Sequence, residues 1–173
     1  SEIALETMRR ADVLVTLQEK AVEQVPEELR DRVTRVIQSA RKLAEREANP
    51  DLFEVCVVGH FRDVKDPLLA ARAVDLLDAE ASTGGRSRIR IRHAGGILDE
   101  KYVDLIAREE NRNPRYHWLG ELSESETAGL LASSDLLVVS SHSEGGARVV
   151  GEAIVHGTPV VSTRIDGVAG LLG

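Results

Sequence analysis

Between residues 52 and 162, short apolar runs alternate with longer segments in which apolar residues recur at helical spacing. The apolar runs are rich in valine, leucine and isoleucine, which is typical of strands buried on both faces of a parallel sheet. This alternation predicts the α/β class, with a parallel sheet and helices on both of its faces. We predict strands at 52–58, 88–93, 116–119, 136–139 and 159–162, and helices at 67–79, 99–109, 123–131 and 147–156.

The first 40 residues show a shorter version of the same pattern. A strand is predicted within 11–17, then a helical stretch, a turn at Pro26, a second helical piece at 27–32 and a strand at 34–38. A charged stretch with the helix-stopping pair Asn49-Pro50 follows and is interpreted as a linker or a helical connector. We therefore expect a piece of a longer protein, divided into the tail of an N-terminal α/β domain (1–40), a linker (41–51) and a C-terminal domain truncated at its end (52–173).

Composition narrows the classes of partner. A net charge of −7 argues against nucleic acid or an anionic membrane surface, and no apolar run is long enough to span a bilayer. The single cysteine, Cys56, excludes an intrachain disulfide, so a reducing cytoplasmic compartment is the simplest expectation. The five histidines show no metal-binding spacing, and no metal or cofactor is predicted.

Four loops follow predicted strands, at 59–65, 95–98, 120–121 and 140–146. Ligands bind at the carboxyl ends of parallel strands, so these loops are the candidate site. The loop at 140–146 carries Glu144, and Gly145 and Gly146 lead into a helix that holds Glu152. Glycines at a helix start let main-chain N–H groups approach an anion.

The two glutamates flank this anion site. If the helix starts near Gly146, Glu144 and Glu152 lie roughly 10–12 Å apart along the axis, with the anion between them. A ligand with hydroxyls at both ends and a diphosphate in the middle suits that layout, and a nucleotide-sugar is such a molecule. The alternative is an acidic loop followed by an ordinary solvated helix glutamate.

The loop at 59–65 supplies candidate cations. Lys65 stands just before a helix and is within reach of a diphosphate as a point charge, while Arg62 offers a fork of donors. The alternative is a solvated basic loop. Three weaker signals are the Gly95-Gly96 pair, which permits close backbone approach or a plain tight turn, Trp118, which suits the core better than stacking, and His142, which contacts donor or acceptor or has no role.

These residues resemble the donor-binding signature of the GT-B glycosyltransferases that carry two glutamates eight positions apart. The match comprises Ser141, Glu144, Gly145, Glu152, Ala153, Gly157, Pro159, Val160 and Val161. The resemblance implies a Rossmann-like C-terminal half of a GT-B fold.

The resemblance also implies roles for individual residues. Glu152 holds the ribose and Glu144 the donor sugar. Lys65 and the Gly145 and Gly146 amides stabilise the departing nucleoside diphosphate, which makes Lys65 and Glu144 the expected catalytic residues. The backbone from Leu119 to Glu121 meets the base.

One departure concerns the diphosphate loop. Gly59 and Lys65 match the family, but His60 stands where an arginine is expected. The second cationic contact therefore falls to Arg62 or to a protonated His60.

Several longer phrases are similar to one subgroup, the selenosugar synthases of selenoneine biosynthesis, and these include GHFR at 59–62 and SSHSEGGA at 140–147. This similarity implies transfer of N-acetylglucosamine from UDP to selenophosphate, with a missing N-terminal domain holding the small-molecule acceptor. Two alternatives stay open. One is a non-catalytic nucleotide-binding regulatory domain, and the other is a GT-B enzyme of ordinary glycan or lipid biosynthesis. The chain by itself is expected to bind donor without turnover.

Overall fold

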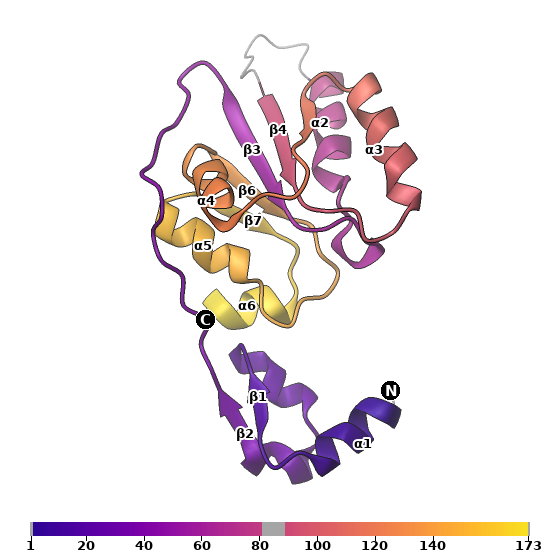
Figure 1. The fold of residues 1–173 in the computed structure, drawn as a ribbon, viewed down its shortest axis with the longest axis vertical. Coiled ribbons are helices and arrows are strands. Elements are labelled where there is room, and N and C mark those ends of the chain that lie inside the picture. Colours follow the sequence, from indigo (N-terminus) through magenta and orange to yellow (C-terminus); the bar gives the residue numbers. More distant parts are fainter. Residues whose placement is uncertain (1, 81–88, 173) are drawn as a thin grey trace.

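The computed structural model describes residues 2–80 and 89–172. Figure 1 shows a larger part built on a five-stranded sheet and a smaller part at the N-terminal end, joined by an extended connection. The connection, residues 36–52, contains neither helix nor strand. The two parts meet at helix α6 (Asp166–Leu172), which packs against the N-terminal 3₁₀ turn η1 (Glu19–Gln24).

The larger sheet confirms the predicted fold class. All of its strand pairs are parallel, and the strand order is β5-β4-β3-β6-β7. Central strand β3 therefore pairs with β4 on one side and β6 on the other. The chain builds outward from β3 through β4 to β5, and then crosses back to add β6 and β7 on the other side of β3. Arg88, the predicted first residue of the second strand, lies outside the described residues. The strands are β3 (Phe53–Val58), β4 (Ile89–Ala94), β5 (Tyr116–Trp118), β6 (Leu136–Val139) and β7 (Val160–Ser162).

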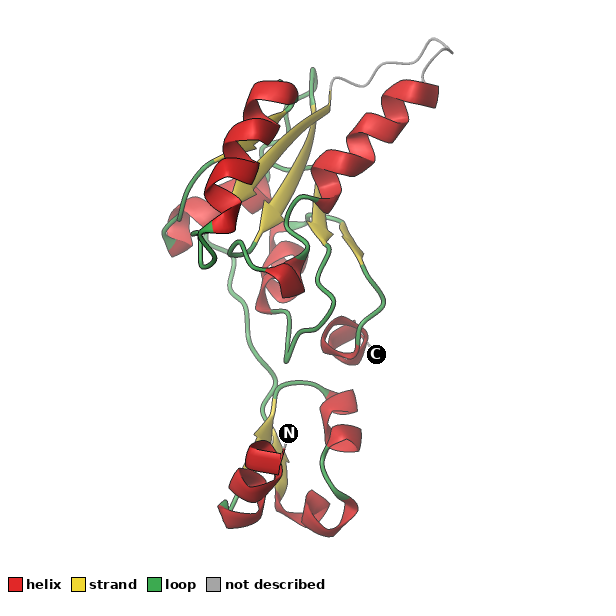
Figure 2. Cartoon of the chain, turned by 90° about the vertical axis from the view of Figure 1, so that its right-hand side faces the viewer, coloured by secondary structure: helices red, strands yellow, loops and turns green. Residues whose placement is uncertain are grey.

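Helices cover both faces of this sheet, as Figure 2 shows from the side. Alternate side chains of each strand point to opposite faces, so β3 sends Cys56 to one core and Val55 and Val57 to the other. The Cys56 core packs against α4, α5 and α6, the opposite core packs against α2, and an adjoining cluster around Phe61 packs against α3. These helices are α2 (Leu69–Glu80), α3 (Lys101–Arg112), α4 (Glu124–Ala132) and α5 (Arg148–His156).

Helix boundaries follow local chemistry. Ser123 begins α4 with a reciprocal capping box to Glu126, which satisfies two N–H groups that the first turn leaves free. Gly157 ends α5 in the left-handed conformation (φ 74°), as the sequence predicts. Helix α6 was not predicted.

The smaller part contains α1 (Glu2–Arg10), two 3₁₀ segments and two short strands. Strands β1 (Leu14–Thr16) and β2 (Val33–Arg35) pair in parallel. The helical pieces predicted here are η1 and η2 (Glu27–Arg32), which are 3₁₀ and not α-helical, and the second strand ends three residues earlier than predicted. The proposed division into domains stays a prediction.

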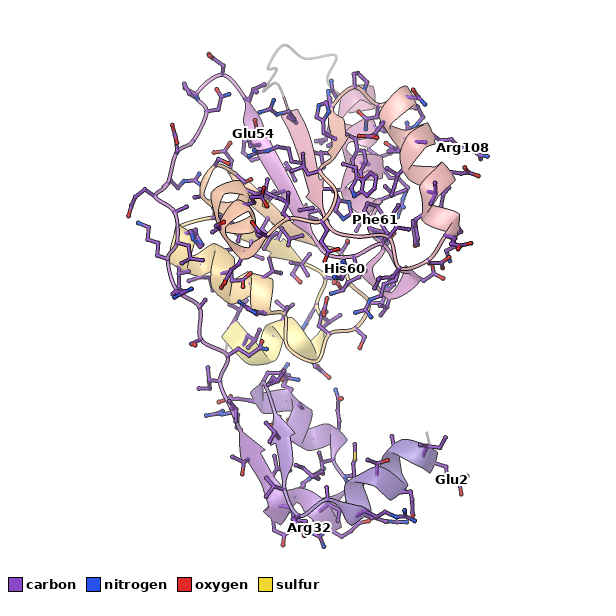
Figure 3. The ribbon with its side chains drawn as sticks, in the orientation of Figure 1. Glu2, Arg32, Glu54, His60, Phe61 and Arg108 are labelled. Atoms are coloured by element: carbon purple, nitrogen blue, oxygen red, sulfur yellow. The ribbon has the colours of Figure 1, made fainter. Side chains whose placement is uncertain are left out.

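A buried charge cluster lies near the amino end of the central strands. Glu54, whose side chain is 2% exposed, accepts two hydrogen bonds from the guanidinium of Arg90 and forms an ion pair with Arg92 (3.1 Å). Asp135 accepts the main-chain N–H of Glu54 and pairs with Arg46 of the connection. Figure 3 shows Glu54 at the end of the sheet opposite to His60, so this cluster supports the fold at a distance from the candidate site.

Candidate functional site

The loops that follow β3, β4 and β5 form one layer through main-chain hydrogen bonds. The Gly59 N–H donates to the Ala94 carbonyl (2.9 Å), and the Gly95 N–H donates to the Gly120 carbonyl (2.8 Å). Gly95 has φ 156°, and a Cβ there would clash with the carbonyl of Gly59. The sequence left two meanings for this glycine, and the structure identifies it as a point of close backbone approach.

Lys65 and Glu144 meet at the junction of the loops after β3 and β6. Their side chains, 20% and 12% exposed, form an ion pair, and the Ser141 hydroxyl donates to the same Glu144 oxygen (2.6 Å). The Ser140 hydroxyl donates to the Lys65 carbonyl (2.8 Å), and the His142 N–H donates to the Val64 carbonyl (2.8 Å). The structure therefore brings together two predicted site residues that are 79 positions apart.

Glu152 lies on α5 and lines a separate, larger cleft. The Nε atom of Arg148, one turn earlier, is 2.8 Å from Glu152 Oε1, and the same guanidinium reaches Glu124 on α4 (3.3 Å). The cleft has a volume of about 830 Å³ and is open between the connection and helices α4 and α5. Its lining includes His60, Leu122, Thr127, Val149 and His156.

The two glutamates line adjoining cavities. Glu144, Lys65 and Ser141 line a small cavity of about 20 Å³, while Glu152 lines the large cleft. Val58 and Val149 line both, so the two spaces share a wall at the carboxyl end of β3 and the start of α5. A ligand held by both carboxylates would pass along this wall.

The glycines before α5 differ in their surroundings. The helix begins at Arg148, one residue later than predicted, with Ala147 as its N-cap. Gly145 is exposed and faces open space. A Cβ at Gly146 would lie 2.9 Å from the Cβ of Leu17, because the smaller part of the chain packs against this position. The approach to the helix start is therefore covered at Gly146 and open at Gly145.

His60 and Arg62, the two candidates for the second cation, differ in their contacts. The Gly96 N–H donates to Nδ1 of His60 (2.9 Å), so that nitrogen carries no proton in this arrangement. A protonated His60 would lose this hydrogen bond. The Arg62 side chain, by contrast, is exposed to solvent.

The predicted base-contacting segment lies beside His60. Glu121 and His60 line a cavity of about 220 Å³ together with Gly95. The Leu119 N–H donates to the His93 carbonyl (2.8 Å), which fixes the backbone at the start of this segment. The Trp118 indole donates to the Gly95 carbonyl (2.9 Å), and its ring packs edge-on against Phe61, so Trp118 is a structural residue.

The sequence of this chain matches one known protein family. The family described as "Glycosyl transferases group 1" matches residues 38–173, which is most of the chain and includes all of the larger part. The chain belongs to the group 1 glycosyltransferases. None of the curated protein sequences compared with it matches.

Solved structures show that this group 1 chain has the fold of GT-B proteins. HepE from Anabaena, in complex with UDP-glucose, has a TM-score of 0.67 at 20% identity, covering 96% of this chain and 49% of that one. A mutant of TarM from S. aureus, in complex with fondaparinux, α-GlcNAc-glycerol and UDP, gives 0.71 at 15%, with 95% and 32% covered.

A third structure is the pneumococcal O-GlcNAc transferase GtfA in complex with UDP and GlcNAc, with a TM-score of 0.63, 16% identity, and 95% and 32% of the two chains covered. The group 1 chain thus spans about half the length of HepE and about a third of TarM and GtfA. At these identities the likeness establishes the shared fold.

One buried residue of this group 1 chain was missed by sequence reasoning. His93, at the carboxyl end of β4, is 0% exposed, and burial lowers its pKa to about 4. Its ring nitrogens bond the Tyr116 hydroxyl (2.9 Å) and the Gly59 carbonyl (3.0 Å). Its strand, IRIRHA, already alternates isoleucine with arginine, so one more ionisable residue near its end gave no distinct signal.

Two features of the described residues, 2–80 and 89–172, bear on other classes of site. Within those ranges, no group of three His, Cys, Asp or Glu side chains is placed to hold a metal ion. Over the same ranges, none of the helices has both the length and the apolar character needed to cross a bilayer.

Proposed function

We propose that this chain binds the nucleotide-sugar donor of a glycosyltransferase, with UDP as the nucleotide. The observation that carries the proposal is the meeting of Lys65 and Glu144 beside the glycine-led start of α5, next to the cleft that Glu152 lines. Membership of the group 1 family supports it, as do the UDP or UDP-sugar complexes of HepE, TarM and GtfA.

In this proposal each part of the donor has its own partners. Lys65 and the main-chain amides of Gly145 and Gly146 contact the diphosphate, and they stabilise the negative charge that grows on the leaving nucleoside diphosphate. Glu144 holds hydroxyls of the transferred sugar and Glu152 those of the ribose. The backbone at residues 119–121 meets the base. Arg62 is the second cationic contact, or else His60, which would have to give up its bond from the Gly96 N–H to become cationic.

Both glutamates have cationic partners within the chain, which shapes how a donor enters. Lys65 pairs with Glu144, and Arg148 pairs with Glu152. A diphosphate offers Lys65 a second anion, so the ammonium can bridge phosphate and carboxylate without leaving its position. Sugar and ribose hydroxyls then donate to carboxylate oxygens that already face the two cavities.

The finer assignment is UDP-N-acetylglucosamine as donor and selenophosphate as acceptor, in a reducing cytoplasm. It rests on the similarity of the GHFR and SSHSEGGA segments to selenosugar synthases, and Cys56 is free and buried. Within this proposal, residues 52–173 form the donor domain and the acceptor is held by the N-terminal side of the protein. Selenophosphate and sugar acceptors offered together to the active protein would separate this assignment from ordinary glycan synthesis.

Glu152→Gln is expected to weaken the binding of UDP-N-acetylglucosamine by about 1–3 kcal/mol, because the amide presents one acceptor where the carboxylate presents two. Calorimetric titration of the whole chain with UDP-N-acetylglucosamine measures this effect. The matched control is Glu124→Gln, which removes the same charge from the same cleft and from the same Arg148 partner.

The control variant should bind close to the parent value. Equal weakening by both substitutions would point to a general loss of negative charge in the cleft and not to a ribose contact. A Glu152→Gln protein that binds as tightly as the parent would contradict the assigned role of Glu152.

A further inference from the structure

His93 occupies a fully buried position between the core and the candidate site. It is the last residue but one of β4, and its ring stacks on Phe61 with 4.2 Å between ring centroids. Its side chain reaches out of β4 to the main chain of β3, where one ring nitrogen bonds the Gly59 carbonyl. His93, Gly59, Lys65 and Glu144 all line the same small cavity.

The hydrogen bonds of His93 define its protonation state. A carbonyl oxygen can only accept, so the ring nitrogen facing Gly59, Nε2, carries the proton. Nδ1 then accepts from the hydroxyl of Tyr116, which is 1% exposed. Burial keeps the imidazole neutral by lowering its pKa to about 4, so both bonds persist at neutral pH.

Gly59 links His93 to Lys65, because its carbonyl bonds His93 and its Cα side lies against the lysine. The Gly59 N–H bonds Ala94 and its carbonyl bonds His93, so both main-chain groups of this residue are held by β4. The position of a Cβ at Gly59 lies 3.8 Å from Cδ of Lys65, which places the lysine stem against the glycine. A shift of Gly59 would therefore move the surface on which Lys65 rests.

We propose that His93 is a positioning residue for donor binding, which holds the Gly59 carbonyl and thereby fixes Lys65 where it meets the diphosphate. The inference takes its ligand, the diphosphate of UDP, from the proposed function. The hydrogen bond that holds the Gly59 carbonyl is a property of the chain itself. His93 does not touch the donor. It acts through Gly59 and Lys65, and the Gly59 carbonyl fixes its tautomer.

Two substitutions separate the hydrogen bond from the volume of the side chain. His93→Phe keeps an aromatic ring against Phe61 and removes the donor to Gly59, whereas the amide nitrogen of His93→Gln can still donate there. Hydrogen exchange in the ligand-free chain should show the Phe61 amide, which bonds the Gly96 carbonyl (2.9 Å), exchanging about tenfold faster in His93→Phe, because one net hydrogen bond is lost. His93→Gln should exchange within about threefold of the parent.

UDP titration supplies the second measurement. His93→Phe should bind UDP about tenfold more weakly than the parent, and His93→Gln should recover most of that loss. Unchanged exchange in His93→Phe would overturn the inference whatever the UDP result, and so would equal defects in His93→Phe and a folded His93→Gln. A parent chain that does not bind UDP would instead overturn the proposed function, and the exchange measurement would still decide the role of His93.

Discussion

Replacing Lys65 by methionine is expected to weaken UDP binding about a hundredfold and to leave uridine binding unchanged, because truncating one partner of a buried charge contact costs about 2–5 kcal/mol. Methionine keeps the apolar stem that lies against Gly59 but removes the ammonium. The ammonium is 79 positions from its carboxylate partner in sequence, yet both side chains are largely buried at the same junction. Parallel titrations with UDP and uridine separate the diphosphate contribution from that of the nucleoside.

A stability control is needed, since the substitution also leaves Glu144 without its cation. The double variant Lys65→Met with Glu144→Gln removes both charges, so its thermal unfolding midpoint should recover toward the parent value. Its UDP affinity should stay as weak as that of the single variant. A Lys65→Met protein with UDP affinity within about threefold of the parent would remove Lys65 from the diphosphate site.

Glu54→Gln is expected to reduce the free energy of unfolding by about 3 kcal/mol, because it leaves the buried ends of Arg90 and Arg92 without their carboxylate. This value is at the lower end for buried pairs, since the Arg90 side chain is 39% exposed and water screens part of the loss. For a chain of this size the midpoint of thermal unfolding should fall by about 6–12 °C. Denaturant and thermal unfolding measure the two quantities.

Asp75→Asn is the matched control for Glu54. Asp75 pairs with Arg112 at the surface, where the side chains are 39% and 52% exposed. Removing its charge should change the free energy of unfolding by less than about 1 kcal/mol. UDP affinity of folded Glu54→Gln should match the parent, because Glu54 lies at the opposite end of the sheet from His60 (Figure 3). Equal losses of unfolding free energy in Glu54→Gln and Asp75→Asn would contradict the claim that burial makes the Glu54 ion pairs more important for stability than the surface pair of Asp75.

Strands β3, β6 and β7 and most helices of the larger part were predictable because burial leaves a clear apolar signal, whereas β4, IRIRHA, shows an alternation of apolar and charged residues. The same signal hides exceptions. Glu54 lies inside the β3 run and His93 at the end of β4, and each is stabilised by partners that are distant in sequence. Helix α6 was missed because its sequence, DGVAGLL, contains two glycines and is short. Its first glycine, Gly167, packs against the Glu144 carbonyl, a contact that no local pattern encodes.

The candidate site was predictable in its parts but not in its internal pairing. The glycines, Lys65 and Glu144 follow strands, and parallel strands bring their carboxyl ends to one edge. The ion pair between Lys65 and Glu144 and the separate pairing of Glu152 with Arg148 depend on side-chain conformations set by tertiary packing. The contact of Leu17 with Gly146 also depends on how the smaller part packs against the larger one.

A crystal structure of the chain with UDP tests the central claim most directly. The account predicts that the diphosphate lies within hydrogen-bond distance, about 2.7–3.2 Å, of Lys65 Nζ and of a main-chain amide at Gly145 or Gly146. The ribose hydroxyls should face Glu152. A nucleotide whose phosphates lie away from both loops, with the ion pair of Lys65 and Glu144 undisturbed, would contradict the account.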